Sequence, residues 1–160
     1  MSMEVYVFSD RRLDSMAEWQ AALDDAGFNI RLDASRDFLD VAGFLPVTID
    51  DRQSGFECDH FDAGKVLDEL KAEGFPADRQ WRWLLAFRFG GLRYECISAL
   101  VSAALYMRAT GGVLFDCEEG EYYGPDSALD YAEKASNPMG WDNLERLMQG
   151  MATKAPDQST

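Results

Sequence analysis

The sequence predicts a single α+β domain in which helices pack on a mostly antiparallel sheet of about five to six strands. Three observations predict this class. Segments that alternate apolar and polar residues, as strands do, are interleaved with segments whose apolar residues recur at helical spacing. Two strand-like segments follow one another across a short polar turn, as in a hairpin. No linker, repeat or low-complexity segment divides the 160 residues, a length that fits one domain.

The first 32 residues carry two strand signals on either side of a helix signal. Residues 4–8 alternate and are rich in Val and aromatic side chains, which is typical of strands. Ser15 and Glu18 have the spacing of a capping box, and Gly27 has the position of a helix terminator, so a helix is expected between them. Residues 28–32 alternate again and predict the second strand.

Residues 33–61 predict a hairpin that follows an ambiguous segment. Residues 33–43 fit either a short helix or a loop. Residues 44–49 and 55–58 have the composition of strands, and residues 50–54 between them contain the Asp and Ser that suit a hairpin turn. We therefore expect two neighbouring antiparallel strands joined by these five turn residues.

The middle of the chain carries the clearest strand and the clearest helix. Asp62 predicts the N-cap of a helix that runs to Lys71. Residues 80–89 alternate over ten positions, a pattern that a helix does not explain. The expected inward face of this strand consists of Trp81, Trp83, Leu85, Phe87 and Phe89. Residues 92–109 are apolar around most of a helical circumference, so this helix is expected to be packed on two sides.

The last third of the chain predicts two short strands and two helices around one acidic turn. The strands are expected at residues 113–115 and 121–123, and the helices at residues 126–134 and 141–148. The turn between the strands covers residues 116–120. Residues 151–160 are expected to form a disordered tail, which leaves residues 1–150 as the single domain.

Acidic residues dominate the charge of the chain. Asp and Glu number 29 against 15 Lys and Arg, which gives a formal net charge of −14. Residues 1–60 carry 13 acids and 5 bases, residues 116–160 carry 10 and 3, and residues 61–115 carry 6 and 7. Such a field repels phosphate backbones and anionic lipids, so nucleic acid and membrane partners are not expected and a basic protein partner is favoured. The simpler interpretation is that the acids only solubilise the surface.

The cysteines and the start of the chain favour a reducing, cytoplasmic location. Cys58, Cys96 and Cys117 are scattered singly, and an odd number of cysteines argues against a closed disulfide framework. The first residues lack a basic region followed by an apolar run, so no secretory signal is expected. The longest weakly polar segment, residues 96–107, is too short and too rich in Ala and Ser to span a bilayer.

Cys58 and His60 are the weak candidates for catalysis. His60 is the only histidine, and on a strand it would share a face with Cys58, as a nucleophile and its base require. The sequence indicates no orienting third group, so the alternative is a core cysteine near a half-exposed histidine. Four zinc ligands would have to come from three distant segments, and no phosphate-binding glycine pattern occurs, so neither a metal nor a cofactor is expected.

Two acidic turns are the candidate surface for a protein partner. Carboxylates pair with Lys and Arg, and tyrosines supply contact area at low entropic cost. Both residue types are concentrated in the turn after residue 115, and the turn after residue 49 adds two further acids. The candidate partner-binding residues are Asp50, Asp51, Asp116, Glu118, Glu119, Glu121, Tyr122 and Tyr123. The alternative is a pair of solvated turns without a partner.

Three segments at the ends of the expected elements share a pattern with a known group of proteins. They are Glu4–Asp10, Leu85–Gly91 and Ala109–Asp116, the last followed by Glu119-Gly120. These segments resemble small bacterial proteins that are similar to the immunity proteins of polymorphic or contact-dependent toxin systems. The resemblance extends to about residue 131, and Cys117 and Glu118 depart from it where Pro and Gln are expected. It implies a protein that binds a cognate toxin and blocks its active site, with acidic immunity proteins facing basic toxins.

The leading hypothesis is therefore a cytoplasmic immunity or inhibitor protein whose acidic turns cover a basic surface or active site of a toxin. One alternative is a small enzyme that uses the Cys58 and His60 pair beside Arg82 or Arg88. Another is a structural or regulatory subunit that dimerises through sheet edges. The sequence leaves the choice between a monomer and a homodimer open.

Overall fold

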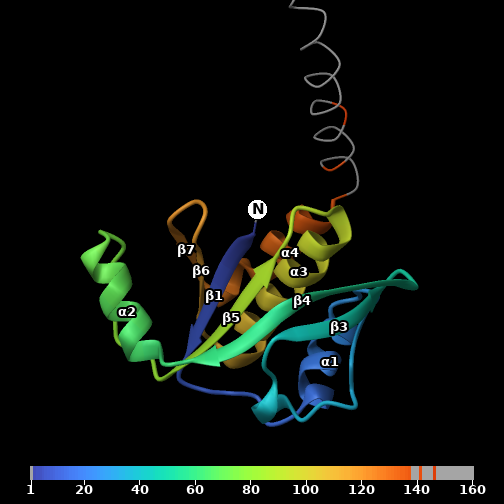
Figure 1. The fold of residues 1–160 in the computed structure, drawn as a ribbon, viewed down its shortest axis with the longest axis horizontal. Coiled ribbons are helices and arrows are strands. Elements are labelled where there is room, and N and C mark those ends of the chain that lie inside the picture. The colour runs from blue at the N-terminus through green and yellow to red at the C-terminus, as the bar shows by residue number, and fades with distance from the viewer. Residues whose placement is uncertain (1, 138–140, 142–145, 147–160) are drawn as a thin grey trace, which may run out of the picture.

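The computed structural model describes residues 2–137, 141 and 146, and these residues form a seven-stranded antiparallel sheet with four α-helices (Figure 1). The strands are β1 (Met3–Ser9), β2 (Ile30–Leu32), β3 (Phe44–Ile49), β4 (Arg52–Phe61), β5 (Trp83–Phe89), β6 (Val113–Asp116) and β7 (Glu121–Tyr123). The helices are α1 (Met16–Asp25), α2 (Ala63–Ala72), α3 (Arg93–Thr110) and α4 (Ala128–Ser136). The strand order is β2-β3-β4-β5-β1-β6-β7. The expected fold class is confirmed, and the sheet has slightly more strands than expected.

The described helices lie on both faces of the sheet, three on one face and one on the other. The main core joins α1, α3 and α4 to the inward residues of the sheet, such as Val7, Leu45 and Phe87. A smaller core joins α2 to the opposite face of β1, β5 and β6, through Phe8 and Phe115. No described helix covers the outer face of β2 and β3, so this part of the sheet is open (Figure 1).

Helix α3 is buried around most of its circumference, as expected. Twelve of its 18 residues are buried, because the sheet packs on one side and α1 and α4 pack on the others. Most of these residues are Ala, Ser or aliphatic residues, which let neighbouring elements approach closely. The indole N–H of the buried Trp19 in α1 donates to the backbone carbonyl of Ser102 at 3.0 Å, which joins the two helices. No helix among the described residues is long and apolar enough to cross a membrane.

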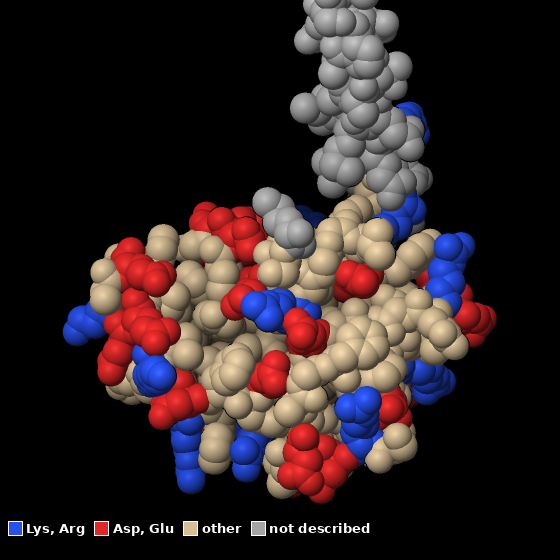
Figure 2. Space-filling model, in the orientation of Figure 1, with Lys and Arg blue, Asp and Glu red and all other residues tan. Residues whose placement is uncertain are grey.

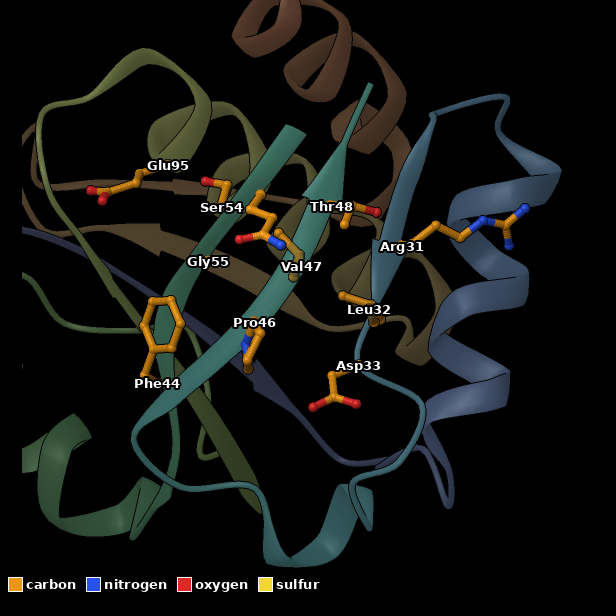
Figure 3. Close-up of a pocket in the computed structure, with 11 residues that line it drawn as sticks. Arg31, Leu32, Asp33, Phe44, Pro46, Val47, Thr48, Ser54, Gly55 and Glu95 are labelled. Atoms are coloured by element: carbon orange, nitrogen blue, oxygen red, sulfur yellow. The ribbon is translucent and has the colours of Figure 1, made fainter. Parts of the chain in front are cut away.

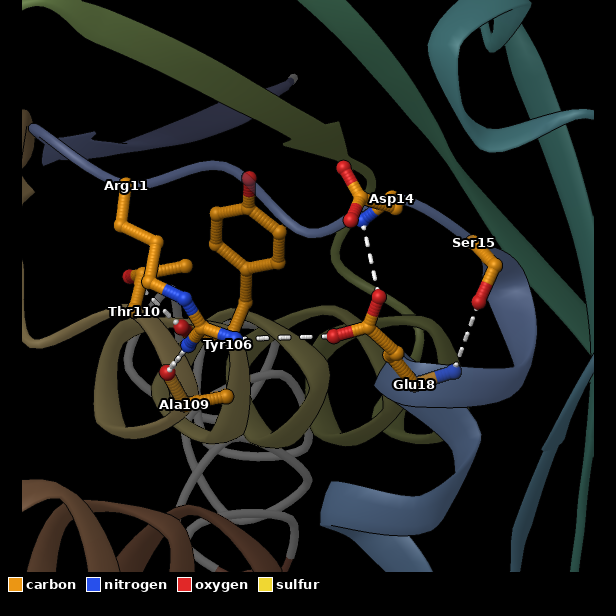
Figure 4. Close-up of polar contacts among 7 residues, drawn as sticks. All are labelled: Arg11, Asp14, Ser15, Glu18, Tyr106, Ala109 and Thr110. Carbon is orange, nitrogen blue, oxygen red and sulfur yellow. Dashed lines mark hydrogen bonds and ion pairs between the residues drawn. The ribbon is translucent and has the colours of Figure 1, made fainter.

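The start of α1 has the capping box that the sequence predicts, with one difference (Figure 4). The Ser15 hydroxyl accepts a hydrogen bond from the Glu18 N–H at 3.2 Å. The Glu18 carboxylate accepts from the Asp14 N–H rather than from Ser15 itself. Glu18 also lies 3.6 Å from the Arg11 guanidinium, which donates to the Ala109 carbonyl near the end of α3. The helix cap therefore also anchors the chain that leads into α1.

The turn between β3 and β4 is shorter than the five residues that the sequence suggested. Asp50 and Asp51 alone form it, with φ values of 49° and 64°, and Ile49 pairs with Arg52. A two-residue turn with both residues in the left-handed region matches the twist of the flanking strands, and Asp tolerates that region well. The expected turn residues 52–54 are therefore strand residues, and β4 begins three residues earlier than expected.

Strand β5 begins at Trp83, three residues later than expected, so the inward face proposed for residues 81–89 is wrong at its start. The pairing with β1 ends where Ser9 meets Trp83. The Asp10 carboxylate then accepts a hydrogen bond from the Arg82 N–H at 3.2 Å and replaces a strand partner. Trp81 lies before the strand and packs with the smaller core on the α2 side, whereas Leu85 and Phe87 belong to the main core.

Residues 33–43, which the sequence left open, have a clear outcome, whereas two segments predicted near the C-terminus are not tested. Residues 33–43 form a loop with a single 3-10 turn, Phe38–Asp40. The helix expected at residues 141–148 and the tail expected at residues 151–160 fall outside the described residues, apart from Trp141 and Arg146. The indole N–H of Trp141 donates to the Ala135 carbonyl of α4 at 2.6 Å.

Candidate interaction site

The turn between β6 and β7 is held in shape by its first acidic residue. One carboxylate oxygen of Asp116 accepts hydrogen bonds from the N–H groups of Glu118 at 2.9 Å and Glu119 at 3.2 Å. The Gly120 N–H donates to the Asp116 carbonyl at 2.8 Å, and Gly120 takes the left-handed conformation, with φ at 69°. Glu118, Glu119 and Glu121 are exposed. The turn therefore presents their carboxylates from a hydrogen-bonded backbone.

The two tyrosines of β7 point to opposite faces of the sheet, because neighbouring side chains on a strand alternate. The Tyr122 hydroxyl donates to the Phe75 carbonyl at 2.9 Å, which ties the hairpin to the chain after α2. The Tyr123 hydroxyl donates to the Glu119 carboxylate at 3.2 Å on the face where α3 and α4 lie. Of the two tyrosines, only Tyr123 shares a surface with the acids of the turn.

The turn at Asp50 and Asp51 lies at the same end of the sheet as the β6–β7 turn but far from it. The antiparallel order places β5 and β1 between the two hairpins, so their centres are about four strand spacings, or roughly 19 Å, apart. The β3–β4 hairpin also extends beyond the residues of β4 that pair with β5. Figure 1 shows the two tips pointing away from each other. The two acidic turns therefore do not form one continuous patch.

Acidic side chains are spread widely over the surface. Figure 2 shows Asp and Glu across the whole visible face, with Lys and Arg between them. Several of these acids form ion pairs with neighbouring cations, such as Glu4 and Glu57 with Arg88 at 3.6 Å each. Some of the acidic charge is therefore locally balanced, and local geometry as well as net charge must distinguish a partner site.

Cys58 and His60 point to the same face of β4, as expected for a strand, but the thiol is fully buried. Burial raises the pKa of the Cys58 thiol well above its usual value, and the charge of Asp59 raises it further. His60 packs edge-on against Phe38 with ring centroids 5.0 Å apart, and its Nε2 lies 2.9 Å from the Phe38 carbonyl oxygen. Arg88 lies on the opposite face of the sheet. Because the thiolate is the reactive form of cysteine, this geometry favours a packing role.

The open outer face of β2, β3 and β4 is a surface that the sequence reasoning missed (Figure 3). It carries a shallow cavity of 570 Å³. Phe44 is 54% exposed there, and its ring lies over Gly55, where a Cβ atom would be 2.3 Å from the ring. Phe44, Pro46 and Thr48 alternate with the buried residues of β3. The apolar residues on both faces of this strand were the available signal.

Known proteins offer no guide to the family. No family model, no curated protein and no solved structure matches the chain. The resemblance to bacterial immunity proteins therefore stays a hypothesis. Within the described part of the chain, no group of three or more His, Cys, Asp or Glu side chains could hold a metal ion.

The free edge of β2 bears on the alternative of a dimer formed through sheet edges. The Gln20 side chain of α1 donates to the Ile30 carbonyl and accepts from the Leu32 N–H, both at 2.8 Å. Arg31 between them pairs with Thr48 of β3. The Gln20 amide therefore makes the two hydrogen bonds that a further strand would make, and it closes this edge to strand addition.

Replacing Gln20 with Ala should open this edge. We expect the free energy of unfolding to fall by about 1–3 kcal/mol, because two hydrogen bonds are lost. We also expect stronger concentration-dependent association in sedimentation velocity than for the unmodified protein. The matched control is Gln80→Ala at an exposed position, which should change stability by less than about 0.5 kcal/mol. Equal behaviour of the two variants would contradict an edge-closing role for Gln20.

Proposed function

We propose that this protein is a cytoplasmic binding protein of the immunity or inhibitor type, whose β6–β7 hairpin contacts a basic surface of a protein partner such as a toxin domain. The observation that carries the proposal is the order of the acidic turn. Asp116 fixes the backbone of Glu118 and Glu119, so the carboxylates are presented from a fixed loop before any partner arrives. Less conformational entropy is then lost on binding.

The carboxylates of this turn are distinguished by their closeness, since three exposed acids lie within four residues of the chain. Among the described residues, no Lys or Arg forms an ion pair with Glu118, Glu119 or Glu121, whereas Glu4, Glu18 and Glu57 each pair with an arginine. Unpaired carboxylates near one another raise the local negative potential, which attracts a basic partner and accelerates its association. An immunity protein that must reach its toxin quickly would benefit from such acceleration.

The proposal is tested by reversing the charge of the turn. The first step is to co-purify the protein with basic proteins encoded next to its own gene, and to measure whether it suppresses their toxicity. Glu118, Glu119 and Glu121 are then changed to Lys together. We expect the affinity for that partner to fall by at least about a hundredfold, and its salt dependence to weaken, because close charge pairs contribute strongly at protein interfaces.

The matched control makes the same charge change away from the turn. Asp25, Asp40 and Asp68 are exposed and lie on or near three other elements, α1, the 3-10 turn and α2. Changing these three residues to Lys should reduce the affinity much less, because only the long-range field changes. If both triple variants bind equally well, or if neither differs from the unmodified protein, the hairpin is not the binding surface.

A further inference from the structure

A cavity of 380 Å³ lies beside the acidic hairpin, between β7, α4 and the middle of α3. Leu100 of α3 and Tyr131 of α4 form part of its wall. Tyr123 of β7 packs edge-on against Tyr131, with ring centroids 4.9 Å apart. The carboxylates that line it are those of Asp116, Glu119 and Asp130. The cavity thus combines aromatic and aliphatic walls with several negative charges.

Asp116 is the most buried of these acids, with only 9% of its surface exposed. A carboxylate so far removed from water is ordinarily paired with a cation. One Asp116 oxygen is used by two backbone N–H groups of the turn. Within the described residues, however, no Lys or Arg forms an ion pair with Asp116 or Glu119. The buried Asp116 carboxylate therefore has no cationic partner among the described residues.

The only cation among the described residues that line the cavity is Lys134, and it lies at the surface. Its ammonium group is 3.0 Å from the Asp130 carboxylate one helical turn earlier, and the two side chains are 78% and 66% exposed. Lys134 therefore neutralises the charge of Asp130 at the surface. It leaves two of the three carboxylates, Asp116 and Glu119, to define the charge of the cavity.

The two tyrosines respond to this negative potential. Burial first, and then the charge of Glu119, raise the pKa of Tyr123 to about 12. The pKa of Tyr131 is also raised, first by burial and then by the charge of Asp116. The carboxylate charges of Glu119 and Asp116, which oppose phenolate formation here, favour a cation in the same place. The tyrosine rings themselves attract cations through their faces.

The cation that fits is an organic one. The acids here do not form a group that could hold a metal ion, since the described residues contain no such group. A guanidinium or ammonium group on an aliphatic stem matches the combination of carboxylates and aromatic walls. We propose that this cavity takes one Arg or Lys side chain of the basic partner and so anchors it beside the hairpin. This inference rests on the proposed function.

The test begins without a partner, so that it does not depend on finding one. N-acetyl-arginine methylamide and N-acetyl-lysine methylamide are titrated into the full-length protein, with the neutral N-acetyl-citrulline methylamide as the matched probe. Backbone amide shifts are followed by NMR. We expect saturable shifts at Gly120, Tyr123 and Tyr131 with at least one cation, with a dissociation constant on the order of millimolar, and none with citrulline.

Asp116→Asn is the decisive variant, because asparagine keeps an oxygen that can accept the two backbone hydrogen bonds of the turn. It should weaken binding of the cationic probe by at least about fivefold. The paired control is the double variant Asp50→Asn with Asp51→Asn in the other acidic turn. It removes two negative charges, whereas Asp116→Asn removes one, and it should leave probe binding unchanged. Unchanged amide shifts outside the turn would show that Asp116→Asn is folded.

Two outcomes would overturn the inference, and both differ from failure of the proposed function. Absence of saturable shifts with either cation, or equal shifts with citrulline, would remove the cavity as a cation site, whatever the hairpin binds. Loss of probe binding in Asp116→Asn without any loss of affinity for the basic partner would show that the partner places no side chain there. The proposed function fails separately, when charge reversal of the turn leaves partner affinity intact.

Discussion

Trp19→Ala is expected to lower the free energy of unfolding by about 3–5 kcal/mol, enough to unfold much of a marginally stable population. Trp19 is fully buried between α1, α3 and the sheet. Its ring makes edge-on contacts with Phe38, Phe87 and Tyr106, at centroid distances of 5.5–5.9 Å. The substitution leaves a cavity at the centre of the main core and also leaves the Ser102 carbonyl without its indole donor. Urea unfolding followed by far-UV circular dichroism measures the loss.

The control for Trp19 is another tryptophan that the sequence does not distinguish from it. Trp83 is only half-buried, and its ring lies under the Arg12 guanidinium at 3.9 Å rather than in the main core. Trp83→Ala should therefore destabilise the protein less than half as much as Trp19→Ala. A loss of stability at Trp83 equal to that at Trp19 would contradict the placement of Trp19 at the centre of the core.

Gly112→Ala should be the most damaging of the glycine substitutions, with a loss of about 3 kcal/mol or more, or a failure to fold. A Cβ atom at this position would lie 2.1 Å from the Phe8 carbonyl oxygen and 2.9 Å from the Ser9 Cβ. The backbone of β1 cannot move away from the methyl group, because β1 pairs with β5 and β6 on its two sides. Thermal unfolding and soluble yield measure the effect.

Gly91→Ala is the matched control for Gly112→Ala. Gly91 also stands in a glycine pair next to α3, but a Cβ atom there would meet nothing within 4 Å. Its substitution should change the free energy of unfolding by less than about 1 kcal/mol in either direction. If the two alanine variants were equally stable, the close approach of residue 112 to β1 would not be a real constraint.

Local signals predicted the caps of α1 and α2 well. Ser15 and Asp62 were recognised as N-caps, and both side chains accept a hydrogen bond from the first helical turn. Gly27 was recognised as the end of α1, and it has a φ of 84°. These features can be predicted from the sequence because a cap is a hydrogen bond between residues three or four positions apart. A helix cap therefore depends almost entirely on residues that are close to it in the chain.

Strand limits were less predictable, because a strand ends where its partner ends. Alternation continued to residue 80, yet β5 begins only where β1 and the Asp10 side chain allow it. The β3–β4 turn was predicted too long, because residues 52–54 look like turn residues until β3 pairs with them. In both cases the limit of a strand depends on the strand that pairs with it. For β5 that strand is β1, far away in the chain, and for β4 it is β3, on the other side of the hairpin turn.

The candidate site also combines features that local sequence predicts with features that depend on distant parts of the chain. The acidic turn could be found from composition, and its members Asp116, Glu119 and Tyr123 do line one cavity. The contribution of α4, through Asp130 and Tyr131, had no signal in the sequence. The Asp50-Asp51 turn was expected to contribute to the same partner surface, but β5 and β1 lie between the two hairpins.

The sequence alone thus determined the class of fold, the positions of the helix caps and the charge that any partner must meet. Each of these depends on residues close together in the chain or on a sum over all residues. Only the tertiary structure decided which tryptophan is core, which glycine lies against a backbone, and which carboxylates share a cavity. Those properties depend on distances between residues that are far apart in the chain, and the pairing and packing of the sheet set them.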